Sequence, residues 1–322
     1  MSCPDCDSLD RRNFLRTTAL GAASLVVAPA ASRHSASSET LVATLYNSLT
    51  SEQKSAVTFP FDHPLRSKVD NNWFITPKKI GAFYTPEQQA MIEEIFRGLH
   101  NPDFVDKVMR HMDEDAKGFK NYTIALFGTP GSGKFEFVLT GRHCTIRCDG
   151  DSVDGAAFGG PIFYGHQAGP SGTEKPDHPG NVYWYQAQRA NEVFRALNGK
   201  QREKALLGDP REEKATSTIE LKKAGEIPGL PVSDMTRDQI ALVDKVLADL
   251  LLPFRKKDTD EAMRFIKANG GAKALTMSFY TNLDLGLDGT WDVWQLESPT
   301  MIWYFRGNPH VHTWVNIRQK PA

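Results

Sequence analysis

The chain has 322 residues, and its 38 lysine and arginine residues almost balance 39 aspartate and glutamate residues, for a formal net charge of -1 at pH 7. Proteins that bind a nucleic acid backbone need a basic surplus to neutralise the phosphates, so this balance argues against nucleic acid as a partner. The length suits one or two domains with a full hydrophobic core, and no segment is apolar for long enough to predict a stable membrane span.

Residues 1–31 have the features of a twin-arginine signal peptide. Arg11 and Arg12 precede a small apolar run from Thr17 to Ala31, and Ala28-Pro29-Ala30 is a cleavage signal. We therefore predict that the twin-arginine export machinery is a partner and that the mature protein is periplasmic or extracellular. Because this route carries proteins that fold before export, often with a cofactor already loaded, it favours a metal or redox cofactor.

Four segments share one helix-start signature, in which a capping residue stands three positions before a glutamine. Apolar residues at helical spacing follow, as at Ile92, Ile95 and Phe96, so each signature predicts an amphipathic helix. Their irregular spacing, and the strand-like sequence between them, exclude a solenoid. The four signatures are Thr50–Gln53, Thr85–Gln88, Asn198–Gln201 and Thr236–Gln239.

Strand-like sequence runs from Tyr122 to Phe163 and again from Leu275 to Arg318, so the chain reads as helices, strands with turns, helices and a terminal meander. Such segregated runs favour an α+β fold with an antiparallel sheet over alternating strands and helices. We predict a single α+β domain over residues 32–322, with packed helices and a C-terminal β-meander. The loop from Gly165 to Asn181, rich in glycine, proline and charge, is long enough to be a lid or a flexible insert.

Gly128 to Lys134 match the phosphate-binding loop up to its lysine. The next position is Phe135, where that loop needs serine or threonine for magnesium. The run from Phe135 to Leu139 also looks like a strand, whereas the motif needs a helix whose N-terminus faces the phosphates. We interpret the segment as a glycine-rich β-turn without a nucleotide.

Two cysteines and a histidine share the next strand-like run. Cys144 and Cys148 are four residues apart in extended sequence, about 13 Å, which is too far for a disulfide bond. Both fall on the Ile146 face and are predicted to be small buried hydrophobic residues. His143 falls on the opposite face, where it is either a metal ligand or simply exposed.

His310 and His312 stand two residues apart in a predicted strand after a tight turn. Because strand side chains alternate, both point away from the apolar face that carries Val311 and Val315. Two imidazoles on one strand and a third from a neighbour can fill three corners of a tetrahedral metal site and leave the fourth for water or substrate. His143 is the candidate for the third ligand.

Other residues near these histidines are candidates for the same site. His166 ends a strand-like run and is a fourth ligand, a general base or a loop residue without a role. Arg142 and Arg306, with Tyr164 and Trp314, are predicted substrate contacts, because arginine beside aromatic walls suits an anionic or aromatic small molecule.

Metal-bound histidines usually donate their other ring nitrogen to a carboxylate or carbonyl. Glu136 and Glu297 are the candidate carboxylates for this role, and nothing in the sequence chooses between them.

Several blocks resemble an uncharacterised bacterial exported family, catalogued as domain of unknown function 3500. That family has Gly-His-His where this chain has Gly141-Arg142-His143, so only His143 carries over, and its Asn-His-x-His block falls on Pro309-His310-Val311-His312. The resemblance supports grouping the three histidines and implies no activity. The blocks are Asn72–Pro77, Leu139–His143, Gly160–Gly165 and Pro309–Trp314.

Two classes of function fit these observations. The first is a metal-dependent enzyme in which His143, His310 and His312 hold copper, iron or zinc and act on a small molecule. Zinc would favour hydrolysis through an activated water, whereas copper or iron would favour oxidation, which the predicted export route slightly favours. The second class is a non-catalytic exported protein that binds a metal or a small molecule. A site closed by His166 would argue for this second class.

Overall fold

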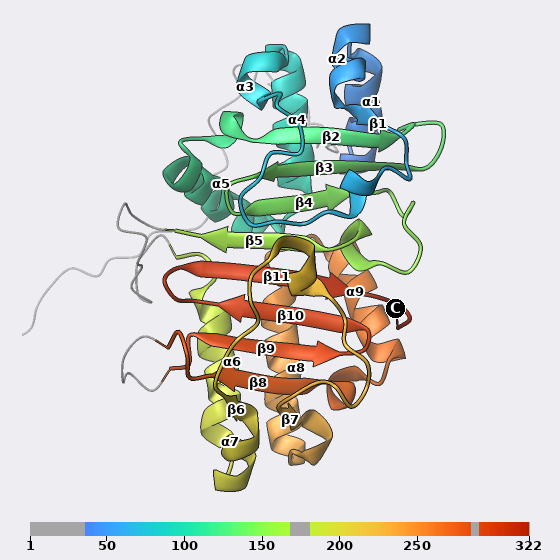
Figure 1. The fold of residues 1–322 in the computed structure, drawn as a ribbon. Coiled ribbons are helices and arrows are strands. Elements are labelled where there is room, and N and C mark those ends of the chain that lie inside the picture. The colour runs from blue at the N-terminus through green and yellow to red at the C-terminus, as the bar shows by residue number, and fades with distance from the viewer. Residues whose placement is uncertain (1–35, 168–180, 285–289, 322) are drawn as a thin grey trace, which may run out of the picture. The chain divides into compact units, whose positions relative to one another are not determined.

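A computed structural model describes residues 36–167, 181–284 and 290–321. The predicted signal peptide and most of the predicted lid loop lie outside these residues. Within them, one sheet of 11 strands has long helices packed on one face and two irregular segments, residues 60–79 and 208–229, on the other. Figure 1 views the sheet from the side of the irregular segments. The predicted α+β class with an antiparallel sheet and packed helices is confirmed.

The first half of the chain supplies two helices, a short strand, three more helices and four consecutive strands. These elements are α1 (Ser38–Ser48), α2 (Ser51–Val57), β1 (Thr58–Phe59), α3 (Ile80–Phe83), α4 (Pro86–Gly98), α5 (Pro102–Ala116), β2 (Thr123–Gly128), β3 (Phe135–Gly141), β4 (Cys144–Cys148) and β5 (Ile162–His166).

The second half supplies a closely similar series and ends in the predicted C-terminal meander. Its elements are α6 (Trp184–Ala196), α7 (Gly199–Ala205), β6 (Leu206–Leu207), β7 (Leu230–Pro231), α8 (Arg237–Leu251), α9 (Lys256–Ala268), β8 (Thr276–Tyr280), β9 (Val293–Ser298), β10 (Met301–Arg306) and β11 (Val311–Ile317). Short 3-10 turns, among them η4 (Ala215–Ile219) and η5 (Val232–Asp234), join these elements.

The strand order shows that the two halves repeat one arrangement. The sheet runs β1-β2-β3-β4-β5-β11-β10-β9-β8-β6, which reads the same from either edge when β1 to β5 are matched with β6 and β8 to β11. The short edge strands β1 and β6 each pair in parallel with a neighbour, and the long strands pair antiparallel. Strands β5 and β11 meet at the centre, so the halves are related by an approximate two-fold axis across that seam.

All four predicted helix starts are capping boxes in the structure. In each half the two capping glutamines also bond to each other through their amides, at 2.8 and 3.0 Å for Gln53 and Gln88 and at 3.0 and 2.9 Å for Gln201 and Gln239. In the sequence, the irregular spacing of these signatures excluded a solenoid, but it did not show that the chain consists of two similar halves. Each half carries one pair of them.

The core on the helical side confirms the prediction for the cysteines. Cys144 and Cys148 are buried free thiols that share this core with Ile146. Smaller apolar clusters lie on the other face, under the two irregular segments. Gly128 to Lys134 form the turn between β2 and β3, as predicted, and a strand follows in place of a helix.

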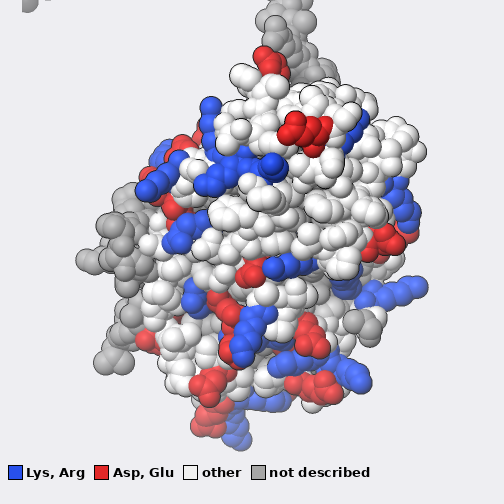
Figure 2. All heavy atoms as spheres, turned by 45° about the horizontal axis from the view of Figure 1, so that its top comes forward, with Lys and Arg blue, Asp and Glu red and all other residues white. Residues whose placement is uncertain are grey.

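The described surface carries charges of both signs. Figure 2 shows lysine and arginine side chains interspersed with aspartate and glutamate side chains over one face of the molecule. Among the described helices, none combines the length and the apolar character that crossing a membrane requires.

Candidate metal centre

Strand β11 confirms the predicted alternation of side chains but not the exposure of its second face. Val311 and Val315 lie in the core on the helical side, whereas Trp314 lies in a cluster on the other face. That second face is buried as well, with exposed fractions of 6% for His312 and 0% for Trp314, because residues 208–229 cover it. The alternation along β11 predicted the face on which each side chain lies, but it could not predict that residues 208–229 cover the second face.

His143 stands in the two-residue turn between β3 and β4, with a positive φ of 52°. Histidine is among the residues that adopt this left-handed conformation more readily than most. The turn is held on both sides, since the Tyr122 hydroxyl donates to the Arg142 carbonyl at 2.9 Å and the His143 amide donates to the Asn71 carbonyl at 2.8 Å. Gly141 allows the close approach of Tyr122, because a Cβ there would lie 2.3 Å from its ring.

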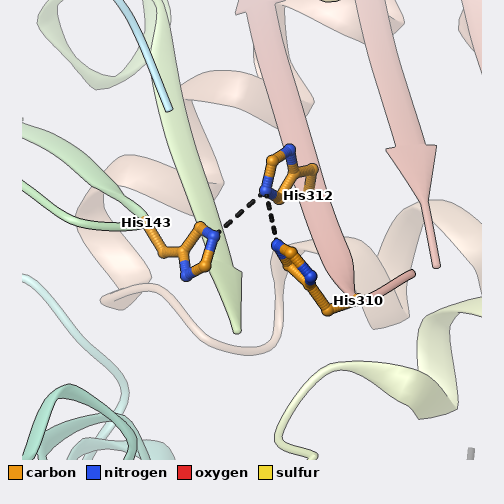
Figure 3. Close-up of side chains that lie close together, drawn as sticks. All are labelled: His143, His310 and His312. Carbon is orange, nitrogen blue, oxygen red and sulfur yellow. Dashed lines mark hydrogen bonds between the residues drawn. The ribbon is translucent and has the colours of Figure 1, made fainter. Parts of the chain in front are cut away.

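The three predicted ligands converge. His310 and His312 come from β11 and the turn before it, and His143 reaches them from across β5, as Figure 3 shows. Nε2 of His312 lies 3.0 Å from Nε2 of His143 and 3.1 Å from Nε2 of His310. One ligand atom from each of the three lies within 4.8 Å of the others. Gly165 on β5 lies beside the His143 ring, and glycine is needed there because a Cβ would lie 2.4 Å from the Val311 carbonyl oxygen of β11.

Two carboxylates orient two of these rings. Asp115 of α5 accepts from Nδ1 of His143, and Glu213, from the segment that covers β11, accepts from Nδ1 of His312 at 2.6 Å. With Nδ1 donating, the Nε2 lone pair of each ring points to the centre of the group, which is the arrangement found behind metal-bound histidines.

Sequence reasoning chose the wrong carboxylates for this role. Glu136 instead pairs with Arg66 and Arg147, and Glu297 pairs with Arg211. Asp115 lies in a helix 28 residues before His143, and Glu213 lies in an irregular segment 99 residues before His312, and no local pattern marks either carboxylate.

The protonation states suit a cation. Burial lowers the pKa of His143 and, more strongly, that of His312, so both imidazoles are neutral at pH 7. Burial raises the pKa of Asp115, but its hydrogen bonds to His143 and Arg142 outweigh burial and bring it to about 2. Burial raises the pKa of Glu213, and the nearby Arg306 opposes this.

The two predicted arginines stand behind these carboxylates. Nε of Arg142 donates to Asp115 at 2.7 Å, and Nε of Arg306 lies 3.0 Å from Oε1 of Glu213. Each orienting carboxylate is therefore shared between a histidine and an arginine. Contact of either arginine with a substrate stays a prediction.

The remaining candidates divide between the two faces of the sheet. Trp314 lies on the histidine face, with its ring centroid 4.7 Å from that of Phe163. Tyr164 is buried on the helical side, where its hydroxyl donates to Gln186 at 2.9 Å. His166, two residues further along β5, shares that side, and its ring packs edge-on against His111 at 4.5 Å. His166 is thus outside the group of three.

Comparison with known proteins identifies a family whose description assigns no function. The family model described as "Protein of unknown function (DUF3500)" matches residues 32–319. The chain belongs to this family. Searches of curated proteins and of solved structures give no match. The family assignment agrees with the resemblance of the sequence blocks, and the chemistry must be argued from the three histidines.

Proposed function

We propose that this member of the family is an exported metal-dependent enzyme that acts on a small molecule, with a transition metal held by His143, His310 and His312. The observation that carries the proposal is the convergence of three Nε2 atoms, two of them on rings whose Nδ1 is held by a carboxylate. The signal peptide features of residues 1–31 support export.

The short distance between His143 and His312 is best explained by a cation. Both rings use Nδ1–H to bond a carboxylate, so both Nε2 atoms present lone pairs, and they lie 3.0 Å apart. Two neutral imidazoles in that state have no proton to share between these atoms. Burial also disfavours a second proton on either ring. A metal ion relieves the repulsion by accepting both lone pairs.

The geometry fits an open tetrahedral site. Metal–nitrogen bonds of about 2.0–2.1 Å at tetrahedral angles separate the nitrogens by roughly 3.3 Å. The His312 Nε2 atom lies 3.0 and 3.1 Å from those of His143 and His310, close to this value, and the three ligand atoms all lie within 4.8 Å of one another. Within the described ranges no fourth histidine, cysteine or carboxylate joins the group, and His166 packs against His111 instead. An open fourth position supports the enzyme over the carrier.

The metal decides the chemistry. Imidazole ligands accept copper, iron and zinc alike, and a bound ion supplies either redox chemistry or a polarising charge. We propose oxidation of a small molecule by copper or iron first, because the export route is suited to a preloaded redox cofactor. Hydrolysis by zinc is the second candidate, since three neutral ligands leave the charge of the ion uncompensated. Arg142, whose side chain is 34% exposed, is the predicted substrate contact that we retain.

Elemental analysis of the untagged protein, purified from the export compartment, tests the proposal. We expect one equivalent of metal per chain in the natural protein, and less than about a tenth of that in a His310→Ala/His312→Ala variant. His63→Ala, at a histidine outside the group, is the matched control and should keep the full equivalent. Copper or iron would support oxidation, and zinc would support hydrolysis.

Full metal content in the double variant would refute the site. A natural protein that takes up no metal even after reconstitution would favour a small-molecule receptor, with the histidines as polar binding groups. Far-UV circular dichroism of each variant separates loss of metal from loss of fold.

A further inference from the structure

A cavity opens on the histidine face of β11, near the end of the strand far from His312. Its volume is about 710 Å³, and β11 contributes Asn316 to its lining, followed by Arg318 just past the strand. Arg318 is six residues beyond His312, which is roughly 20 Å along extended backbone, so the cavity is separate from the metal centre. Thr216, Ser217 and Ile219 of η4 form another wall.

Arg318 is half-buried, and no carboxylate of the described residues forms an ion pair with it. Its Nε donates to Asn316 Oδ1 at 3.1 Å, and no described carboxylate lies within 4.0 Å of its guanidinium. The buried Glu136 is already paired with Arg66 at 2.9 Å and with Arg147 at 2.7 Å. Burial lowers the pKa of Arg318, the positive charges of Arg147 and Arg66 lower it further, and the negative charge of Glu136 opposes these effects. Arg318 therefore lies within the electrostatic influence of Arg66 and Arg147, whose guanidinium groups are already paired with Glu136.

The approximate two-fold axis relates this cavity to the metal centre. At the metal centre the Gly165 amide donates to the His143 carbonyl at 3.2 Å, and at the other end of the seam the Arg318 amide donates to the Thr300 carbonyl at 2.7 Å. His143 and Thr300 are each the second residue of a two-residue turn, between β3 and β4 and between β9 and β10. The same backbone position thus carries glycine beside the histidines and arginine beside the cavity.

The other residues that line the cavity indicate which kind of ligand it can bind. Asp154 and Glu220 carry negative charges and Lys320 a positive one, and all three are exposed, so water and salt screen them more than they screen the half-buried Arg318. Ile219 and Leu221 give the cavity an apolar wall near the Asn316 amide, which donates to the Ile219 carbonyl at 3.1 Å. A planar guanidinium binds a carboxylate through two parallel hydrogen bonds, and an apolar wall accepts an alkyl chain.

We propose that this cavity binds a small organic carboxylate with a short apolar chain, its carboxylate on Arg318 and its chain against Ile219 and Leu221. This site is independent of the metal centre.

Isothermal titration calorimetry of the metal-free full chain with hexanoate tests the proposal. We expect one hexanoate per chain, weaker binding of acetate, which lacks the chain, and no binding of hexanol, which lacks the charge. Arg318→Met should weaken hexanoate binding at least about tenfold, because a charge-assisted hydrogen bond is lost. The hexanoate affinity of Arg318→Lys should lie between that of the natural protein and that of Arg318→Met, since lysine keeps the positive charge but cannot form two parallel hydrogen bonds.

Controls separate this site from the metal centre and from misfolding. Arg237→Met, at an exposed arginine on α8, and His310→Ala/His312→Ala should leave hexanoate affinity unchanged. Ser217→Trp fills the cavity from an exposed position and should also weaken binding at least about tenfold.

Four results would each overturn the proposal. These are the absence of saturable binding, unchanged affinity in Arg318→Met or in Ser217→Trp, inorganic phosphate binding as tightly as hexanoate, and loss of binding in the histidine double variant.

Discussion

The two halves of this chain share a plan and differ in the polar residues placed upon it. The shared plan extends to single hydrogen bonds: the Ile80 amide donates to the Tyr122 carbonyl at 2.9 Å, and the Val232 amide donates to the Leu275 carbonyl at 2.8 Å, each at the start of the equivalent helical turn. Where the halves meet, Asn101 donates to Pro253 and Arg255 donates to Leu99, at 2.9 and 3.1 Å. Such reciprocal bonds are what a two-fold relation produces.

The differences show how the candidate site arose from a symmetric frame. The turn that carries His143 in the first half carries Thr300 in the second. His310 and His312 come from the second half alone, so neither half contains the three ligands. The centre forms only because β5 and β11 place the two halves edge to edge. The features that both halves share therefore stabilise the fold, whereas the histidines that differ between the halves form the candidate metal site.

The largest effect on the free energy of unfolding is expected at the buried charge cluster around Glu136 in the first half. Glu136 has a fully buried side chain bonded to Arg66 and Arg147, and Glu136→Gln leaves those guanidinium groups without a counter-charge. Loss of one partner of a buried ion pair costs about 3–5 kcal/mol of the free energy of unfolding. Urea denaturation measures this loss. Glu93→Gln, at an exposed pair with Arg97, is the control and should cost less than about 1 kcal/mol.

His100 breaks the symmetry at the junction of the halves, where it pairs with Phe254. Burial lowers the pKa of His100 to about 4, against a slight opposing effect of its bond to the Phe96 carbonyl. Because its pKa is depressed in the folded state, the unfolded chain takes up the proton first. The stability contributed by neutral His100 is present above pH 6.5 and is lost as the pH falls toward 4.

His100→Phe would place phenylalanine in both halves and remove this titration. Between pH 7 and pH 4 the natural protein should lose about 3 kcal/mol more of its free energy of unfolding than the variant does. Urea denaturation at both pH values measures the difference. Equal losses in the two proteins would show that His100 does not contribute to acid sensitivity.

Each half supplies one of the two carboxylates that orient the histidines, and we expect both to contribute similarly to metal affinity. Asp115→Asn and Glu213→Gln each remove the negative charge behind one imidazole, and either change should lower metal affinity about 10–100-fold. Competition with a metal chelator measures this. Asp149→Asn, a carboxylate outside the group, is the control. Unchanged affinity in both site variants would mean that the carboxylates serve only their arginines.

The smallest effect tests the repeat itself. Gln88 and Gln239 each cap a helix and bond the partner glutamine, and each donates to the carbonyl of the last residue of an earlier helix, Ser48 of α1 or Ala196 of α6. Gln88→Ala and Gln239→Ala should therefore each cost about 2 kcal/mol of the free energy of unfolding. Thermal and urea denaturation compare them. Costs that differ severalfold would show that the shared bonds are not energetically equivalent.

Much of the local structure could be predicted from sequence. The capping boxes join residues three apart, and the alternation along β11 depends only on strand geometry, so both were confirmed without knowledge of the fold. The grouping of His143, His310 and His312 also agrees with the structure, because two of them stand two residues apart at the start of β11 and the third stands beside a strand end. The identity of the orienting carboxylates could not be predicted this way.

By itself the sequence determined the helix starts, the strand faces, the α+β class and the three histidines, because each depends on near neighbours in the chain. The tertiary structure decided which distant groups meet them. Asp115 and Glu213 reach the histidines only when α5 and the segment over β11 pack against the sheet. The same packing buries the second face of β11 and sets His166 apart. These carboxylate contacts join residues 28 and 99 positions apart, so they depend on the whole fold and no local spacing encodes them.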